Sequence, residues 1–198
     1  MNVPNRITLC RIILSILLLV LIIFPMEKIG IDFPEFKIAN VIINSKYLIC
    51  GVIFMIASLT DFLDGYLARK YNLVTDLGKV MDAIADKVLV NGVLIVLAVE
   101  GYISVVVPVV IVSRDIFVDS IKMVAGQKSG AVGASKAGKF KTAFMLVGIT
   151  LLFFQDIPFS LLGVNFVSHT IIMIATVLSV ISGIQYYVKN KKYLFDTK

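Results

Sequence analysis

The stretch DFLDGYLARKYNLVTDLGKVMDAIAD, which runs from Asp61 to Asp86, decides how this sequence is interpreted. Its surroundings are as apolar as membrane spans, yet it contains several carboxylates. A charged side chain at the centre of a bilayer costs about 2.5–3.5 kcal/mol on insertion scales, so charges in such segments usually belong to a functional site. Carboxylates that approach one another also repel unless cations lie between them. The residues concerned are Asp61, Asp64, Asp82 and Asp86.

The composition of the whole chain is that of an integral membrane protein. Of its 198 residues, 59% are hydrophobic and 16% are charged, whereas soluble domains average about 25% charged residues. Six apolar segments are each near the length that a helix needs to cross about 30 Å of hydrocarbon. They predict an all-α fold with six transmembrane helices in one bundle, forming a single domain over residues 1–198. The segments are residues 8–26, 47–69, 78–99, 105–125, 138–154 and 167–188.

The connectors between these segments alternate in charge. Basic residues precede the first segment, lie in the second connector (residues 69–79), crowd the fourth (122–141) and follow the last segment. By the positive-inside rule, this predicts a multi-pass protein of the cell membrane with both termini in the cytoplasm. The net charge of +6 is then explained by topology and anionic lipid, and no nucleic-acid partner is expected. Residues 27–46, which include Pro34, are expected to form a mixed loop.

Helical spacing gives the carboxylates a common direction. Residues three, four and seven positions after Asp61 share one face of the second predicted helix, and those four and eight positions after Gly78 share one face of the third. The intervening residues 71–76 contain plausible turn and N-cap residues. We therefore expect an antiparallel hairpin whose polar halves meet near the cytoplasmic surface. The two faces carry Asp61, Asp64, Gly65 and Ala68, and Gly78, Asp82 and Asp86.

Converging carboxylates predict a site for hard divalent cations. Asp oxygens suit Mg²⁺ or Mn²⁺, and the lack of Cys and His at these positions argues against structural zinc. Two such ions would balance four negative charges and can clamp a diphosphate. Gly65 and Gly78 allow close approach of a helix or ligand, and Arg69 can hold phosphate oxygens in a bidentate manner. The simpler alternative is that these charges only pair with neighbouring basic residues.

The same stretch resembles the signature of the CDP-alcohol phosphatidyltransferases, D-x2-D-G-x2-A-R-x8-G-x3-D-x3-D, at every fixed position. The resemblance implies a six-span membrane enzyme, usually a homodimer, in which an acceptor hydroxyl displaces CMP from a CDP-linked lipid. It implies that Asp61, Asp64 and Asp82 are metal ligands. It also implies that Asp86 is the general base and touches a metal as well. The residues implied on the CDP and diphosphate side are Asp61, Gly65, Ala68, Arg69 and Gly78.

Residues outside the signature bear on the acceptor. Residues 2–8 with Arg11, and residues 85–89, resemble bacterial phosphatidylglycerophosphate synthases. The resemblance implies CDP-diacylglycerol as donor and glycerol 3-phosphate as acceptor, with the active site at the cytoplasmic face. An anionic acceptor needs further cations, and the candidates are Arg114, Lys139 and Lys141. The simpler readings are a salt bridge from Arg114 to Asp115 or Asp119, and membrane topology for the two lysines.

Three other functions remain open at this point. Within the family, the acceptor could be inositol phosphate, inositol or serine. Outside it, Asp ligands in a bilayer also suit a divalent-cation transporter, although a transporter should place them near the midplane on broken helices. Here they lie toward one face, on segments without a mid-span proline. A non-catalytic scaffold is disfavoured because Arg69 and Asp86 of the signature are both present.

Overall fold

The computed structural model describes residues 2–38, 41–71, 73–129 and 135–195. Within these ranges the chain forms six α-helices, and each predicted apolar segment lies largely within one of them. Short 3₁₀ helices at Met26–Ile29 and Phe159–Leu162 follow α1 and α5. The helices are α1 (Val3–Ile23), α2 (Ser45–Lys70), α3 (Asp76–Val99), α4 (Val106–Ser129), α5 (Lys136–Phe153) and α6 (Val167–Phe195).

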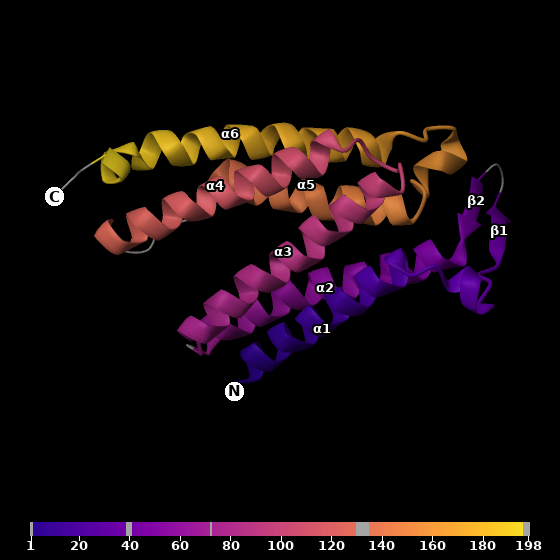
Figure 1. The fold of residues 1–198 in the computed structure, drawn as a ribbon, viewed down its shortest axis with the longest axis horizontal. Coiled ribbons are helices and arrows are strands. Elements are labelled where there is room, and N and C mark those ends of the chain that lie inside the picture. The colour runs from indigo at the N-terminus through magenta and orange to yellow at the C-terminus, as the bar shows by residue number, and fades with distance from the viewer. Residues whose placement is uncertain (1, 39–40, 72, 130–134, 196–198) are drawn as a thin grey trace.

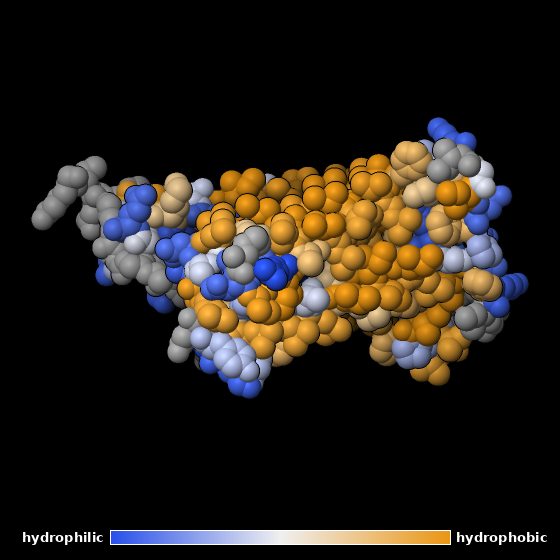
Figure 2. All heavy atoms as spheres, turned by 90° about the horizontal axis from the view of Figure 1, so that it is seen from below, coloured by the Kyte–Doolittle hydropathy of each residue, from blue (hydrophilic) through white to orange (hydrophobic). Residues whose placement is uncertain are grey.

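The outer surface is that of a membrane protein. Large apolar side chains are exposed along α1, α2 and α6, among them Ile13, Phe62 and Val177. Figure 2, which views the molecule from below, shows a broad hydrophobic band across its middle, with hydrophilic residues gathered toward the two ends. Among the described helices, α1, α2 and residues Val167–Leu194 of α6 are long and apolar enough to cross a membrane. In the other three, α3, α4 and α5, every stretch of 18 residues contains at least three charged residues.

The helices form two groups of three. One group contains α1, α2 and α3, and the other contains α4, α5 and α6 (Figure 1). Within the first group α1 packs along both α2 and α3, and within the second α6 packs along α4 and α5. Direct contact between α2 and α3 is slight. The expectation of a two-helix hairpin is therefore wrong in one respect. Helix α1 lies against both α2 and α3, so the site is formed by three helices.

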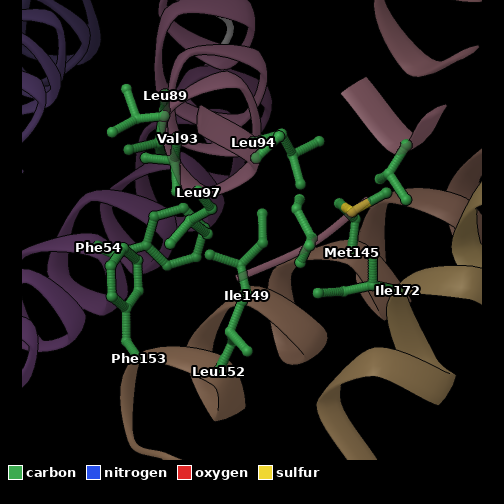
Figure 3. Packing of buried hydrophobic residues seen from close by; sticks show 14 of the residues in the cluster. Phe54, Leu89, Val93, Leu94, Leu97, Met145, Ile149, Leu152, Phe153 and Ile172 are labelled. Carbon is green, nitrogen blue, oxygen red and sulfur yellow. The ribbon is translucent and has the colours of Figure 1, made fainter. Parts of the chain in front are cut away.

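The groups meet in an apolar core to which all six helices contribute, and Figure 3 labels its residues from α2, α3, α5 and α6. The rings of Phe54 and Phe153 lie 5.9 Å apart between centroids, and Leu97 and Ile149 are buried nearby. A Cβ at Gly51 would lie 2.9 Å from Cβ of Phe153, so this glycine lets α2 and α5 approach closely. Within a bilayer such close packing, rather than removal of apolar surface from water, favours helix association.

The connector between α1 and α2 is more ordered than the sequence suggests. Strands β1 (Glu35–Ile38) and β2 (Val41–Asn44) pair antiparallel, with Glu35 opposite Asn44 and Phe36 opposite Ile43. The mixed-loop expectation for this segment is therefore wrong. Asn44 then caps α2, because its side chain accepts a hydrogen bond of 2.9 Å from the backbone N–H of Lys46.

Candidate active site

A polar face of α1 forms one wall of the site. Asn5, Thr8, Arg11 and Ser15 are all buried and recur at intervals of three and four residues, which places them on one helix face. The same face continues with the buried apolar residue Leu18. Because α1 packs along α2 and α3, this polar face lies against the two helices that carry the signature.

Arg11 is the residue around which the carboxylates gather. Its side chain is fully buried, whereas the side chains of Asp61, Asp82 and Asp86 remain partly exposed. Its guanidinium forms an ion pair with Asp61 of α2, and Nη2 donates to Oδ1 of Asp82 of α3 at 2.6 Å. Nη1 also lies 3.5 Å from Oδ1 of Asp86. A single cation from α1 thus links carboxylates of both neighbouring helices.

The remaining signature carboxylate, Asp64, is held separately. It is buried, and its Oδ2 accepts a hydrogen bond of 2.8 Å from Oγ1 of Thr8. Carboxylate oxygens of Asp61, Asp64 and Asp82 lie within 4.8 Å of one another. This all-oxygen set fits a hard divalent cation such as Mg²⁺ or Mn²⁺. Asp86 lies outside this three-residue group but beside it, through its contact with Arg11.

A pocket of about 260 Å³ opens next to these carboxylates. Asp64 and Asp82 belong to its wall, as do Asn5 and Thr8 of α1. Of the residues predicted on the CDP side, all but Asp61 also line it, namely Gly65, Ala68, Arg69 and Gly78. The structure therefore brings the predicted CDP-side residues and two of the predicted metal ligands to one cavity.

The two glycines of the signature differ in what surrounds them. A Cβ at Gly78 would lie 2.7 Å from Oδ1 of Asn5 and 3.0 Å from Oγ1 of Thr75. Thr75 is the N-cap of α3; its Oγ1 accepts from the Gly78 N–H at 3.0 Å and from Nδ2 of Asn5 at 3.0 Å. Gly78 therefore permits the approach of α1 to α3. A Cβ at Gly65 would meet only the Arg69 guanidinium, at 3.5 Å, so Gly65 leaves room at the pocket wall.

The candidate acceptor cations do not all lie together. Arg114 of α4 donates to Oδ1 of Asp115 at 2.9 Å and to Oγ of Ser182 at 2.5 Å. Lys141 of α5, which is buried, donates to the two oxygens of the same Asp115 at 2.9 and 3.2 Å. Arg114 and Lys141 thus meet at one carboxylate. Lys139, two residues earlier on α5, is exposed instead.

Asp119, one helical turn beyond Asp115, has other partners. It forms an ion pair with Lys87 of α3, and its Oδ1 lies 3.8 Å from Nζ of Lys122. The salt bridge considered for Arg114 is therefore formed with Asp115. The Lys87–Asp119 pair also joins the two helix groups close to Asp86.

These features fit the family to which the chain belongs. Residues 1–181 match the family model described as CDP-alcohol phosphatidyltransferase, so the protein is a member of the CDP-alcohol phosphatidyltransferase family and an enzyme of that class. A relative from Bacillus subtilis is 34% identical over 96% of this chain and 95% of its own length. One from Rickettsia felis is 31% identical over 97% of both chains. One from Mycoplasma genitalium is 36% identical over 75% of this chain and 63% of its own. All three are named CDP-diacylglycerol–glycerol-3-phosphate 3-phosphatidyltransferase.

The sequence left open whether Asn5 and Thr8 contact substrate or cap the first helix, and it did not identify Arg11 as the partner of the carboxylates. Arg11 was assigned to membrane topology and to the resemblance of the N-terminus, because a basic residue near the start of an apolar segment commonly sets orientation. The available signal was the spacing of Asn5, Thr8, Arg11 and Ser15, which is that of one helix face. Four polar residues on one face of an otherwise apolar helix indicate that this face is covered by protein and not by lipid.

Proposed function

We propose that this enzyme transfers the phosphatidyl group of CDP-diacylglycerol to glycerol 3-phosphate and releases CMP. The three relatives described above are named for this reaction, and two of them match the chain over nearly their whole length. The observation that carries the proposal is the gathering of the signature carboxylates beside a pocket lined by Gly65, Ala68 and Arg69. A cavity with carboxylates on one side and a guanidinium on the other suits a metal-bound diphosphate.

The metal site in this proposal consists of Asp61, Asp64 and Asp82, with Asp86 as a further ligand for the second of two cations. Support comes from the closeness of the three carboxylates and from their all-oxygen character. When bound, Mg²⁺ or Mn²⁺ would neutralise the diphosphate and stabilise the charge that develops on the departing CMP. Thr8 fixes the orientation of Asp64 through its hydrogen bond, as second-shell partners of ligating carboxylates commonly do.

The remaining signature residues bind and orient the donor. Gly65 and Ala68 leave the space that the CDP group requires, and Gly78 completes the wall of the same pocket where α1 meets α3. Asp61 lies at the metal end of the CDP group, and Arg69 donates to phosphate oxygens. Asp86 acts as general base and takes the proton of the acceptor hydroxyl. That oxygen forms the new bond to the lipid-linked phosphorus while the bond from phosphorus to the CMP oxygen breaks. The partial exposure of the Asp86 side chain is consistent with access for an acceptor from water.

The acceptor phosphate would be bound by Arg114 and Lys141, with Lys139 attracting it from solution. The first two already share one anionic partner, Asp115, so their positions suit an anion placed between them. An acceptor phosphate competes with Asp115 for these donors. This makes the cluster a site that can hold a phosphate reversibly, because a carboxylate neutralises it when no acceptor is bound.

The membrane arrangement in the proposal is that of six spans in one domain over residues 1–198. Both termini and the active site then face the cytoplasm of a cell-membrane protein, and two copies form a homodimer. The apolar band in Figure 2 supports insertion in a bilayer. The basic connectors support the orientation. Several charges of α3, α4 and α5 pair across helices, as Lys87 does with Asp119 and Lys141 with Asp115, and such pairing allows charged helices to span.

An acceptor panel tests the proposed reaction. The purified full-length protein is incubated with CDP-diacylglycerol and Mg²⁺ or Mn²⁺, and CMP release is measured with glycerol 3-phosphate, inositol phosphate, inositol or serine. We expect acceptor-dependent CMP release with glycerol 3-phosphate. Turnover with serine or inositol alone would keep the reaction class and refute the acceptor. No acceptor-dependent CMP from any of them would refute the reaction itself.

A further inference from the structure

The buried guanidinium of Arg11 is paired with two of the carboxylates that a metal ion would need. It is paired with Asp61 and Asp82, two of the three residues whose oxygens converge within 4.8 Å. Mg²⁺ binds oxygen at about 2.0–2.1 Å and tolerates little deviation from octahedral geometry. A guanidinium that bridges Asp61 and Asp82 competes with a metal ion for these carboxylates, because its positive charge repels the ion and its ion pairs fix the two side chains in a different geometry.

The guanidinium of Arg11 also lacks one of the hydrogen bonds that a purely structural ion pair would be expected to have. Its Nε is buried and has no hydrogen-bond partner among the described residues, although buried guanidinium groups usually have all donors satisfied. Asp64, in contrast, is bonded to Thr8 and not to Arg11. Asp64 is therefore not paired with Arg11 and is available for a cation. Asp61 and Asp82 are both paired with Arg11, whose Nε–H is unused.

We propose that Arg11 is the resident counter-cation of the Asp cluster, and that divalent metal binds by displacing its guanidinium from Asp61 and Asp82. The inference rests on the proposed metal site. Without metal, Arg11 relieves the repulsion between carboxylates and keeps α2 and α3 attached to α1. With metal, its charge repels the incoming cations and its ion pairs must open. Arg11 thereby lowers metal affinity while it keeps the metal-free site assembled.

The first test measures Mn²⁺ affinity of the full-length protein in detergent by calorimetry, without substrates. The variants are Arg11→Gln and Arg11→Lys, and the matched control is Arg6→Gln, since Arg6 is an exposed arginine on the same helix. We expect Arg11→Gln to bind Mn²⁺ at least about tenfold more tightly, because it removes a competing charge-assisted pair. Arg11→Lys should stay closer to the wild type, and Arg6→Gln should match it. Weaker or unchanged binding in a folded Arg11→Gln protein overturns the proposal.

The second test needs only the wild-type fold. Arginine side chains are labelled with ¹⁵N, and the Arg11 Nε–H signal is assigned by its loss in Arg11→Lys. Saturation with diamagnetic Mg²⁺ should move this signal strongly, while the Arg6 signal stays in place. A stationary Arg11 signal, with Mg²⁺ binding established by calorimetry, overturns displacement and leaves the metal site intact. Absence of metal binding in both the wild type and Arg11→Gln refutes the metal site itself.

Discussion

Substituting Gly78 by alanine tests whether α1 is part of the site. The added Cβ would lie 2.7 Å from Oδ1 of Asn5 and 3.0 Å from Oγ1 of Thr75. Asn5 is buried and bonded to Thr75, so it cannot move aside without breaking that hydrogen bond. Overpacking costs about 1–3 kcal/mol and a lost hydrogen bond about 0.5–1.5 kcal/mol. The higher helix propensity of alanine offsets up to about 1 kcal/mol. We therefore expect Gly78→Ala to lower the free energy of unfolding by about 0.5–4.5 kcal/mol.

The assay is reversible unfolding in mixed detergent, followed by circular dichroism. Gly126→Ala is the matched control, because Gly126 is a helical glycine of α4 whose Cβ would meet nothing within 4 Å. This control should be neutral or slightly stabilising. Adding Asn5→Ala to Gly78→Ala should recover part of the loss, since the clash and the broken hydrogen bond share one partner. Equal stability of Gly78→Ala and Gly126→Ala would refute the packing of α1 against α3.

Three further predictions concern the chemistry. Asp86→Asn should retain the wild-type circular dichroism spectrum and lose at least about a hundredfold in kcat, because general-base catalysis contributes about 10²–10⁴-fold; wild-type turnover would remove Asp86 from that role. Lys141→Ala should raise KM for glycerol 3-phosphate about tenfold or more, whereas Lys139→Ala, at an exposed position, should change it far less; equal effects would argue against a buried phosphate site. Thr8→Val keeps the side-chain shape but removes the hydrogen bond to Asp64, so Mn²⁺ affinity should fall about tenfold or more, and unchanged calorimetric affinity would contradict this.

The local part of the site could be predicted from sequence because helical periodicity is local. The spacing of Asp61, Asp64, Asp82 and Asp86 was enough to place them on two helix faces. Thr75 was among the residues expected at the turn, and it caps α3 as that pattern suggests. Such features depend on residues within two turns of one another, and no knowledge of distant packing is required.

Two of the missed features depend on distant packing, and a third on the shortness of the strands. Arg11 contacts residues on two other helices, and nothing in its own neighbourhood indicates which ones. Arg114 had two possible partners, one adjacent and one about a turn away. In the structure Arg114 pairs with Asp115, which also pairs with Lys141. Asp119 pairs instead with Lys87, which lies on another helix. The strands of the first connector span four residues each, too few for a clear period-two pattern.

In the proposed reaction, one active site couples CMP release to formation of a lipid from glycerol 3-phosphate. The most direct measurement follows radiolabelled glycerol 3-phosphate into chloroform-soluble lipid while CMP is measured in the same reaction. The purified protein, CDP-diacylglycerol and Mg²⁺ or Mn²⁺ should give lipid-borne label and CMP in equal amounts, and Asp86→Asn should give neither. CMP release without labelled lipid would mean hydrolysis of the donor and would contradict the account.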